Sequence, residues 1–264
     1  MAATDGDGKA FIALTTAFLA ALEQLAPTER AVFLLREVFE FDFDEIATSV
    51  GITEANAREI LTRARGRLRE SDPCGALSRA EYAVTLARRR DHKYSETLAL
   101  AYAALLHQMR LDAERTLASG EAVVKLCERY GFAYYGDWAS LLIGWARGQS
   151  DPGEGVRIIE AALARLDANR AQARRPYYLS LLAETYGRLN ERAQAKVILD
   201  RAIEMAVDRG DVWWLPALYL QRSELESGPE REATVLKALT LARTQQSRAL
   251  EQRILSSSVA ASLK

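Results

Sequence analysis

Residues 53–69 carry a run of side chains whose types suit hydrogen bonding to nucleic acid. Asn can pair with adenine, Arg can pair with guanine or bind a phosphate, and Glu can accept a hydrogen bond from cytosine. Five arginines make this stretch the one basic element of residues 1–72. The candidate DNA contacts are Glu54, Asn56, Arg58, Glu59, Thr62, Arg63, Arg65 and Arg67.

Two short helices around a turn must position these side chains. Residues 41–70 read FDFDEIATSVGITEANAREILTRARGRLRE. Asp42 and Glu45 have the spacing of a capping box, which predicts the start of a short helix. Gly51 is expected to end that helix, and Thr53 is the expected N-cap of the next one. The pattern therefore predicts a helix-turn-helix.

The second helix has an apolar stripe that should fasten it to the first. Ala57, Leu61, Ala64 and Leu68 follow one another at spacings of four, three and four residues, which places them on one helix face. We expect this stripe to pack against Ile46 and Val50. In a helix-turn-helix the first turns of the second helix face base edges and later residues reach phosphates.

That geometry divides the candidates into two groups. The base-reading candidates are Glu54, Asn56, Arg58 and Glu59, and the phosphate-binding candidates are Arg63, Arg65 and Arg67. The alternative is an ordinary helical hairpin whose basic face is only solvated.

Bulk charge argues against strong DNA binding. The chain of 264 residues has a net charge of −1, with 35 basic and 36 acidic side chains. Residues 1–72 hold 8 Lys and Arg against 13 Asp and Glu. An acidic cluster would repel phosphate unless it faces away from the groove; it comprises Glu37, Glu40, Asp42, Asp44 and Glu45. We therefore expect weak, salt-sensitive binding, with a Kd on the order of 10⁻⁴ to 10⁻⁶ M.

The remainder of the chain also has helical periodicity, and alternating strand patterns and hairpin signals are missing. We predict an all-α protein. The stretch SDPCG at 71–75 is the clearest break. It divides the chain into a helix-turn-helix domain, residues 1–72, and a helical-repeat domain, residues 76–264.

The second domain repeats with a period of 40 residues. Ala122, Ala162, Ala202 and Ala242 keep this spacing, and each is expected late in a helix. Apolar residues recur around the alanines, and Trp138 corresponds to Tyr178. Two helices per unit at this period indicate an α-solenoid, here of about four helical hairpins.

The unit at 176–206, PYYLSLLAETYGRLNERAQAKVILDRAIEMA, resembles the tetratricopeptide repeat. Its packing positions would be Leu179, Leu182, Ala183, Tyr186, Ala195, Leu199 and Ala202. Asn190 takes the place of the expected mid-repeat glycine, since Asn tolerates the left-handed conformation. Residues 80–264 are also similar to the helical-repeat region at the C-terminal end of large bacterial ATPase and nucleotide-cyclase regulators. This resemblance implies a scaffold only.

Aromatic side chains crowd at repeat positions. The interpretation we favour is a core between repeats, and the alternative is a concave groove that binds a peptide, protein or small ligand. The groove candidates are Tyr134, Tyr135, Trp138, Tyr177, Tyr178, Trp213 and Trp214.

Residues 11–70 strongly resemble region 4 of bacterial sigma factors, most closely the extracytoplasmic-function group. The matching elements are LAPTERAVFLL, FDFDEIA, VGITEANAR and RARGRL, in order and without gaps. The resemblance implies that the helix at 53–69 recognises a promoter −35 element. It also implies that a surface around residues 22–40 touches the flap of the RNA polymerase β subunit. The matching segment lacks the region that opens the −10 element, so we expect that this chain does not initiate transcription alone.

The sequence contains no recognisable set of catalytic or metal-binding residues. Two cysteines and two histidines, without partners at ligand spacing, predict no metal site, no cofactor and no enzyme activity. The chain has no signal peptide or membrane-spanning run, so we expect a cytoplasmic protein.

The first hypothesis is a transcription regulator with a DNA- or polymerase-binding head and a partner-binding arm. The second is an adaptor whose head never touches DNA, and a third is a fusion whose arm merely stabilises the head.

Overall fold

The computed structural model describes residues 26–37, 42–69, 73–171, 174–208, 212–245 and 247–257. Within these ranges the backbone alone is described at residues 33, 34, 37, 62, 64–69, 73–76 and 79. All regular elements of the described residues are helices, as the all-α prediction requires. They form two compact units, residues 1–95 and 96–264. The boundary expected at 71–75 stays a prediction.

The first unit contains four described helices: α2 (Pro27–Glu37), α3 (Phe43–Val50), α4 (Glu54–Arg69) and α5 (Pro73–Arg89). We call α2–α4 the head. Pro27 opens α2, where its missing N–H is no loss. The Glu29 carboxylate accepts a hydrogen bond from the Ala26 N–H at 3.0 Å, which satisfies one amide at the start of this helix.

The helix-turn-helix forms as its local signals predict. The capping box at the start of α3 is present, and the Asp42 N–H donates to the Glu45 carboxylate at 2.9 Å. Gly51 has a φ of 73° and ends α3, because its N–H and that of Ile52 both donate to the Ala47 carbonyl at 3.0 Å. The Thr53 hydroxyl accepts from the Asn56 N–H at 3.2 Å and caps α4.

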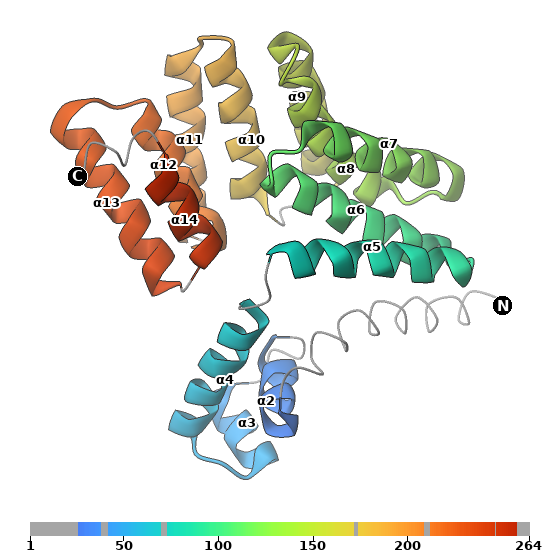
Figure 1. Ribbon diagram of the computed structural model, residues 1–264, viewed down its shortest axis with the longest axis vertical. Helices are drawn as coiled ribbons and strands as arrows, with labels where there is room; N and C mark the ends of the chain where they lie inside the picture. The colour runs from blue at the N-terminus through green and yellow to red at the C-terminus, as the bar shows by residue number, and fades with distance from the viewer. Residues whose placement is uncertain are drawn as a thin grey trace. The chain divides into compact units, whose positions relative to one another are not determined.

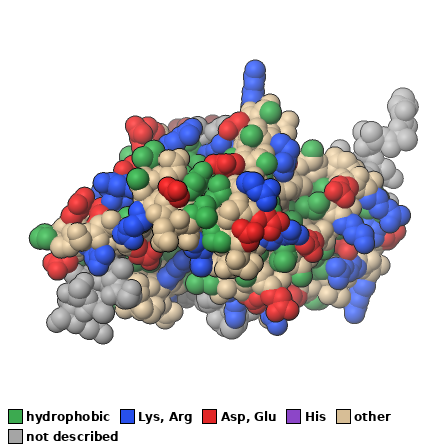
Figure 2. All heavy atoms as spheres, turned by 90° about the horizontal axis from the view of Figure 1, so that it is seen from above, with side chains coloured by type: hydrophobic (Ala, Val, Ile, Leu, Met, Phe, Trp, Pro, Cys, Tyr) green, Lys and Arg blue, Asp and Glu red, His purple; other side chains and the backbone are tan. Residues whose placement is uncertain are grey.

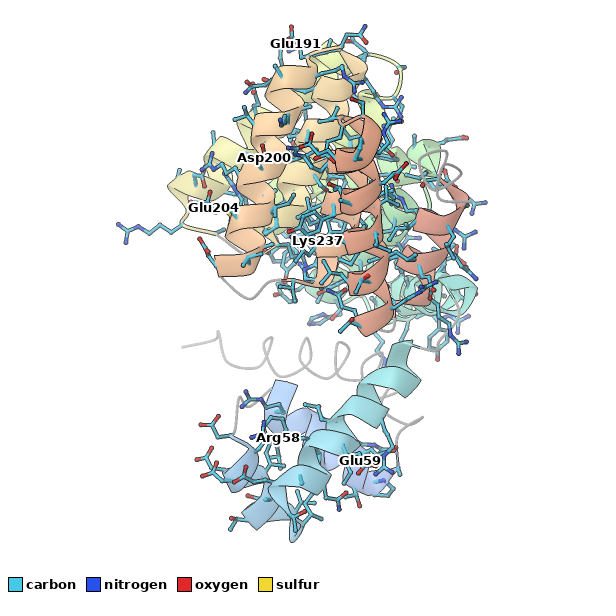
Figure 3. The ribbon with its side chains drawn as sticks, turned by 90° about the vertical axis from the view of Figure 1, so that its left-hand side faces the viewer. Arg58, Glu59, Glu191, Asp200, Glu204 and Lys237 are labelled. Atoms are coloured by element: carbon cyan, nitrogen blue, oxygen red, sulfur yellow. The ribbon has the colours of Figure 1, made fainter. Side chains whose placement is uncertain are left out.

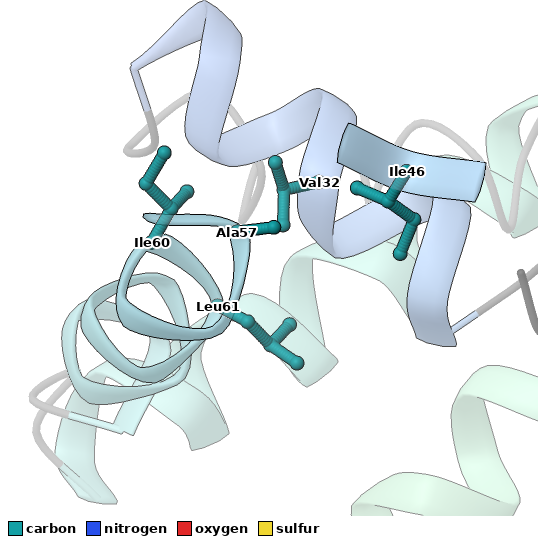
Figure 4. Packing of buried hydrophobic residues seen from close by; sticks show 5 residues of the cluster. All are labelled: Val32, Ile46, Ala57, Ile60 and Leu61. Atoms are coloured by element: carbon teal, nitrogen blue, oxygen red, sulfur yellow. The ribbon is translucent and has the colours of Figure 1, made fainter. Parts of the chain in front are cut away.

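The head has one small core, to which each helix contributes. Its buried side chains are Val32 from α2, Ile46 from α3, and Ala57, Ile60 and Leu61 from α4 (Figure 4). The predicted packing of Ala57 and Leu61 against α3 is therefore confirmed. The side chains of Ala64 and Leu68 lie outside the described ones. Val50 packs at the edge of the cluster together with Leu35, Phe43 and Ile52.

The second unit, which we call the arm, continues as a series of helices from α6 (Lys93–Met109) onward (Figure 1). The next elements are α7 (Ala113–Tyr130), α8 (Ala133–Arg147), α9 (Pro152–Ala168), α10 (Arg175–Arg188), α11 (Arg192–Asp208), the short 3-10 helix η1 (Val212–Trp214), α12 (Leu215–Glu224), α13 (Gly228–Thr244) and α14 (Arg248–Ser256). From α7 to α14, each helix packs on the next.

The arm also has a layered order. Helices α8, α10, α12 and α14 contact one another in succession, which makes them one row. Helices α7, α9, α11 and α13 begin at residues 113, 152, 192 and 228 and alternate with that row. Ala162, Ala202 and Ala242 are fully buried on α9, α11 and α13, so the small side chain recurs where neighbouring helices meet. Ala122 of α7 is half-buried.

Two positions show how particular residues permit this packing. A Cβ on Gly155 of α9 would lie 2.6 Å from the Cα of Gly148, so only glycine allows this close approach to the end of α8. Asn190 has a φ of 61° between α10 and α11, which is the left-handed turn predicted for it.

The surface of the arm carries interspersed acidic and basic side chains on the face that Figure 2 presents. Among the described helices, none has both the length and the apolar character that crossing a bilayer demands.

Candidate nucleic-acid interface

Helix α4 presents a polar face away from the head core. Because Ala57, Ile60 and Leu61 are buried beneath it, the intervening side chains of its first turns point outward. Glu54, Asn56, Arg58, Glu59 and Arg63 are all exposed. Figure 3 shows Arg58 and Glu59 projecting from α4. The structure thus leaves five of the eight candidate DNA contacts exposed on the solvent side of the same helix.

The remaining three candidates, Thr62, Arg65 and Arg67, lie on α4, but their side chains are outside the described ones. Their role stays a prediction. The exposed residues Glu54, Asn56, Arg58 and Glu59 lie in the N-terminal half of α4, the part of a second helix that reaches base edges in a helix-turn-helix, and Arg63 lies just beyond it.

Arg58 is held by two neighbours. Its guanidinium lies 4.2 Å from the centroid of the Phe43 ring and 3.4 Å from the Glu54 carboxylate. Arg36 of α2 lies over the same ring at 5.0 Å. Phe43 is half-buried at the first position of α3, so its ring links the three head helices. With 60% of its side chain exposed, Arg58 remains accessible to a ligand.

Sequence reasoning missed Phe43 and Arg36. No short-range pattern could have found them, because Arg36 and Arg58 lie 7 and 15 residues from Phe43 on other helices. An aromatic residue at the start of α3 was the only signal, and it is common in ordinary cores.

The acidic residues beside the interface have structural roles. Asp42 accepts a hydrogen bond from Arg36 at 3.1 Å, and the Glu45 carboxylate completes the capping box. Asp44 lies in the first turn of α3, where a negative charge interacts favourably with the helix dipole. The acidic cluster is therefore explained in part by the start of α3. The side chain of Glu37 and all of Glu40 lie outside the described part.

Arg63 pairs with Glu59 one turn away, at 3.5 Å. The pair is exposed, with 53% and 68% of the two side chains accessible, so it stabilises the helix by only a few tenths of a kcal/mol, about 0.3–0.5. A phosphate could replace Glu59 as the partner of Arg63 with little loss of folding stability.

Four of the seven aromatic residues that the sequence offered as an alternative groove are buried. Trp138, Tyr177, Tyr178 and Trp214 are buried in the arm, so a partner cannot reach them. Tyr177 lies 5.1 Å from Trp214 edge to face, and Trp214 donates its indole N–H to Ser180 at 3.0 Å. These contacts belong to a core between helices, which was the favoured interpretation.

The other three aromatic candidates keep some exposed surface. Tyr134 and Tyr135 are half-buried, and Trp213 is 38% exposed. Near them, the Arg174 guanidinium lies 4.6 Å over the Trp138 ring and donates to the Tyr102 hydroxyl at 2.7 Å. An internal arginine thus covers part of this aromatic cluster. In the described part of the chain, no three His, Cys, Asp or Glu side chains gather as metal ligands.

The helix-turn-helix segment matches known proteins. The family described as sigma-70, region 4, matches residues 15–68. A Mycobacterium tuberculosis protein named "Probable ECF RNA polymerase sigma factor SigI" is 37% identical over 68 residues, which are 26% of this chain and 23% of that protein. The "ECF RNA polymerase sigma factor SigG" of the same organism is 40% identical over 60 residues, which are 23% of this chain and 16% of that protein.

The match thus spans less than a quarter of each of these relatives and about a quarter of this chain. It includes α2, α3 and nearly all of α4, so it coincides with the helix-turn-helix and ends before the arm. The head is therefore a sigma-70 region 4 domain, similar over this segment to extracytoplasmic-function sigma factors.

Proposed function

We propose that this protein is a transcription regulator or accessory factor whose head binds promoter DNA resembling a −35 element. One observation carries the proposal: within the region 4 match, the exposed face of α4 collects Glu54, Asn56, Arg58, Glu59 and Arg63 above a well-packed core. A rigid helix with such a face fits the major groove, where Arg reads guanine and Asn reads adenine.

The head also has RNA polymerase as a candidate partner, through the surface around residues 22–40 that the resemblance to region 4 implicates. The arm would bind a protein partner, and a chain of this kind would act in the cytoplasm. Support for the arm's role comes from its repeated helices, since such arrays commonly present extended binding surfaces. Its likeness to tetratricopeptide repeats is part of the same proposal.

Fluorescence anisotropy on −35-like and scrambled duplexes, at two salt concentrations, tests DNA binding by the full chain. We expect Arg63→Ala to weaken binding to all duplexes alike, and Arg58→Ala to relax the preference at one base pair. If both variants bind as the wild type does, the head does not read DNA through α4. Circular dichroism checks that the variants are folded.

The second candidate function is an adaptor whose head binds polymerase or another protein without DNA. One observation favours it: Arg58 and Arg63 are each paired with a glutamate of their own helix, so part of their charge is already balanced. Binding of the full chain to a purified RNA polymerase β flap fragment, with no affinity for any duplex at low salt, would favour this function.

A further inference from the structure

A groove of the arm is lined mainly by α10, α11 and α12, and Arg253 of α14 completes the lining. Its volume is about 400 Å³, within the range of protein sites that enclose a ligand. Ala183, Ala195, Leu199, Ala217 and Leu220 supply its apolar lining. Polar side chains come from α10, α12 and α14, and Arg192 adds one at the start of α11. None of the aromatic residues singled out in the sequence lines it.

Two carboxylates face this groove from equivalent positions of successive repeats. Glu184 lies on α10 and Glu224 on α12, 40 residues further along the chain. Glu184 is paired with Arg188 at 3.5 Å. Glu224 uses its main-chain carbonyl to accept a hydrogen bond from Arg192 at 3.0 Å. Its carboxylate has no ion pair with another described residue.

The environment of Glu224 disfavours its negative charge. Although the residue keeps exposed surface, the walls of the groove desolvate its carboxyl, and the nearby Glu184 adds repulsion. Both effects raise its pKa above the ordinary value, and Arg253 and Arg231 oppose them only in part. A cation bound beside Glu224 would stabilise the charged carboxylate and so offset both effects.

A third acceptor lies in the same place. The side-chain oxygen of Gln221 is buried and has no hydrogen-bond partner among the described residues. Buried polar atoms are nearly always hydrogen-bonded, so an orphan acceptor in a groove indicates a missing donor. Two of the arginines in the lining are already engaged, Arg188 by Glu184 and Arg192 by the Glu224 carbonyl. The Glu224 carboxylate and the Gln221 oxygen are thus two acceptors without a hydrogen-bond or ion-pair partner among the described residues, while Arg253 also lines the groove as a donor.

We propose that this groove binds an extended peptide segment of a protein partner through a basic side chain, Arg or Lys, placed among Glu184, Gln221 and Glu224. A guanidinium offers five N–H donors in a fixed fork and can serve several acceptors at once. The apolar lining would take the aliphatic part of the same side chain. Arg253 on α14 also lines the groove.

The inference rests on the partner-binding role proposed for the arm, and it is independent of DNA binding by the head. The probes are short peptides of Ala and Ser, fluorescein-labelled, with a central Arg, Lys, Gln or Glu. They are titrated against the full chain and followed by anisotropy. We expect the Arg and Lys peptides to bind at least about tenfold more tightly than the Gln and Glu peptides, which corresponds to one charge-assisted contact.

Glu224→Gln is the decisive variant. At neutral pH it should lose the preference for basic peptides but raise the melting temperature, because it removes a desolvated charge. Glu232→Gln removes one charge from an exposed position of α13 that does not line the groove, and it should leave peptide binding unchanged. DNA binding should be the same in both variants.

Three results would overturn the inference. If the Gln or Glu peptide binds as well as the Arg peptide, the arm binds peptides but the groove does not select a cation. If Glu224→Gln keeps the full preference, the cation binds elsewhere. If none of the four peptides binds, the proposed partner-binding role of the arm is wrong as well. DNA binding by the head is still tested separately by the duplex assay.

Discussion

Phe43→Leu should loosen Arg58 and so weaken DNA reading without unfolding the head. The Phe43 ring lies under two guanidiniums, at 4.2 Å for Arg58 and 5.0 Å for Arg36. Leucine keeps the side chain apolar at the edge of the head core but offers no π face. Because each cation–π contact at an exposed site contributes about 0.5–1 kcal/mol, we expect the free energy of unfolding of the head to fall by roughly 1–2 kcal/mol.

The effect on binding follows from the freedom that Arg58 gains. An arginine released from its ring must be ordered again when it meets a base, at about 0.5–1.5 kcal/mol. We therefore expect affinity for the preferred duplex to fall about 2- to 10-fold, and the preference at the base pair read by Arg58 to shrink. Anisotropy on duplexes that differ at single positions measures both quantities.

Two further variants separate positioning from general destabilisation. Phe43→Tyr keeps the π face and should retain the base preference. Val50→Ala trims a side chain that packs on the same cluster but offers no π face, so it should lower stability while keeping the preference. If Phe43→Leu binds the duplex as tightly as the wild type, or more tightly, the stacking does not position Arg58 for reading and the reasoning is refuted.

Four other changes have defined outcomes. Arg63→Ala should reduce the slope of log affinity against log salt by about 0.9, as expected for one lost phosphate contact, and an unchanged slope would contradict that role. Asn190→Ala should lower the stability of the arm in urea unfolding by roughly 1–2 kcal/mol, whereas Asn190→Gly should not, because the residue has a φ of 61°. Burial raises the pKa of the Cys127 thiol to about 11, so in a Cys74→Ser protein alkylation by iodoacetamide at pH 8 should be at least about a hundredfold slower than for an exposed thiol. Glu224→Gln should raise the melting temperature above the raised pKa of Glu224, and the gain should vanish below the ordinary carboxyl value of 4.5, where the wild-type side chain is protonated in both the folded and unfolded states.

Much of the head could be predicted because its signals are local. Asp42 and Glu45 are three residues apart, Gly51 requires only its own backbone conformation, and the Ala57–Leu61 stripe follows helical spacing. Each of these depends on hydrogen bonds or faces within about one helical turn, which is the range over which a sequence pattern is explicit. Ile60 was missed, although it lies three residues after Ala57 on the same side of the helix.

The arm shows the same division. Its 40-residue repeat determined the alternation of helices, the buried alanines of α9, α11 and α13, and the left-handed turn at Asn190. The repeat could not say which aromatic residues are buried, because that depends on contacts between neighbouring helices. For Trp138 and Tyr178 the sequence favoured a core and left a groove open as the alternative, and packing placed both in the core.

By itself, then, the sequence determined the all-α class, the helix-turn-helix, its exposed basic helix and the periodic arm, because these follow from short-range hydrogen bonding and apolar periodicity. Only the tertiary structure decided that the guanidiniums of Arg36 and Arg58 stack on the Phe43 ring. It alone also decided that Glu184, Gln221 and Glu224 line one groove. Each of these groupings joins residues of at least two helices, and no pattern along the chain records which helix faces meet. Their chemistry arises from proximity, which only the packing of the helices creates.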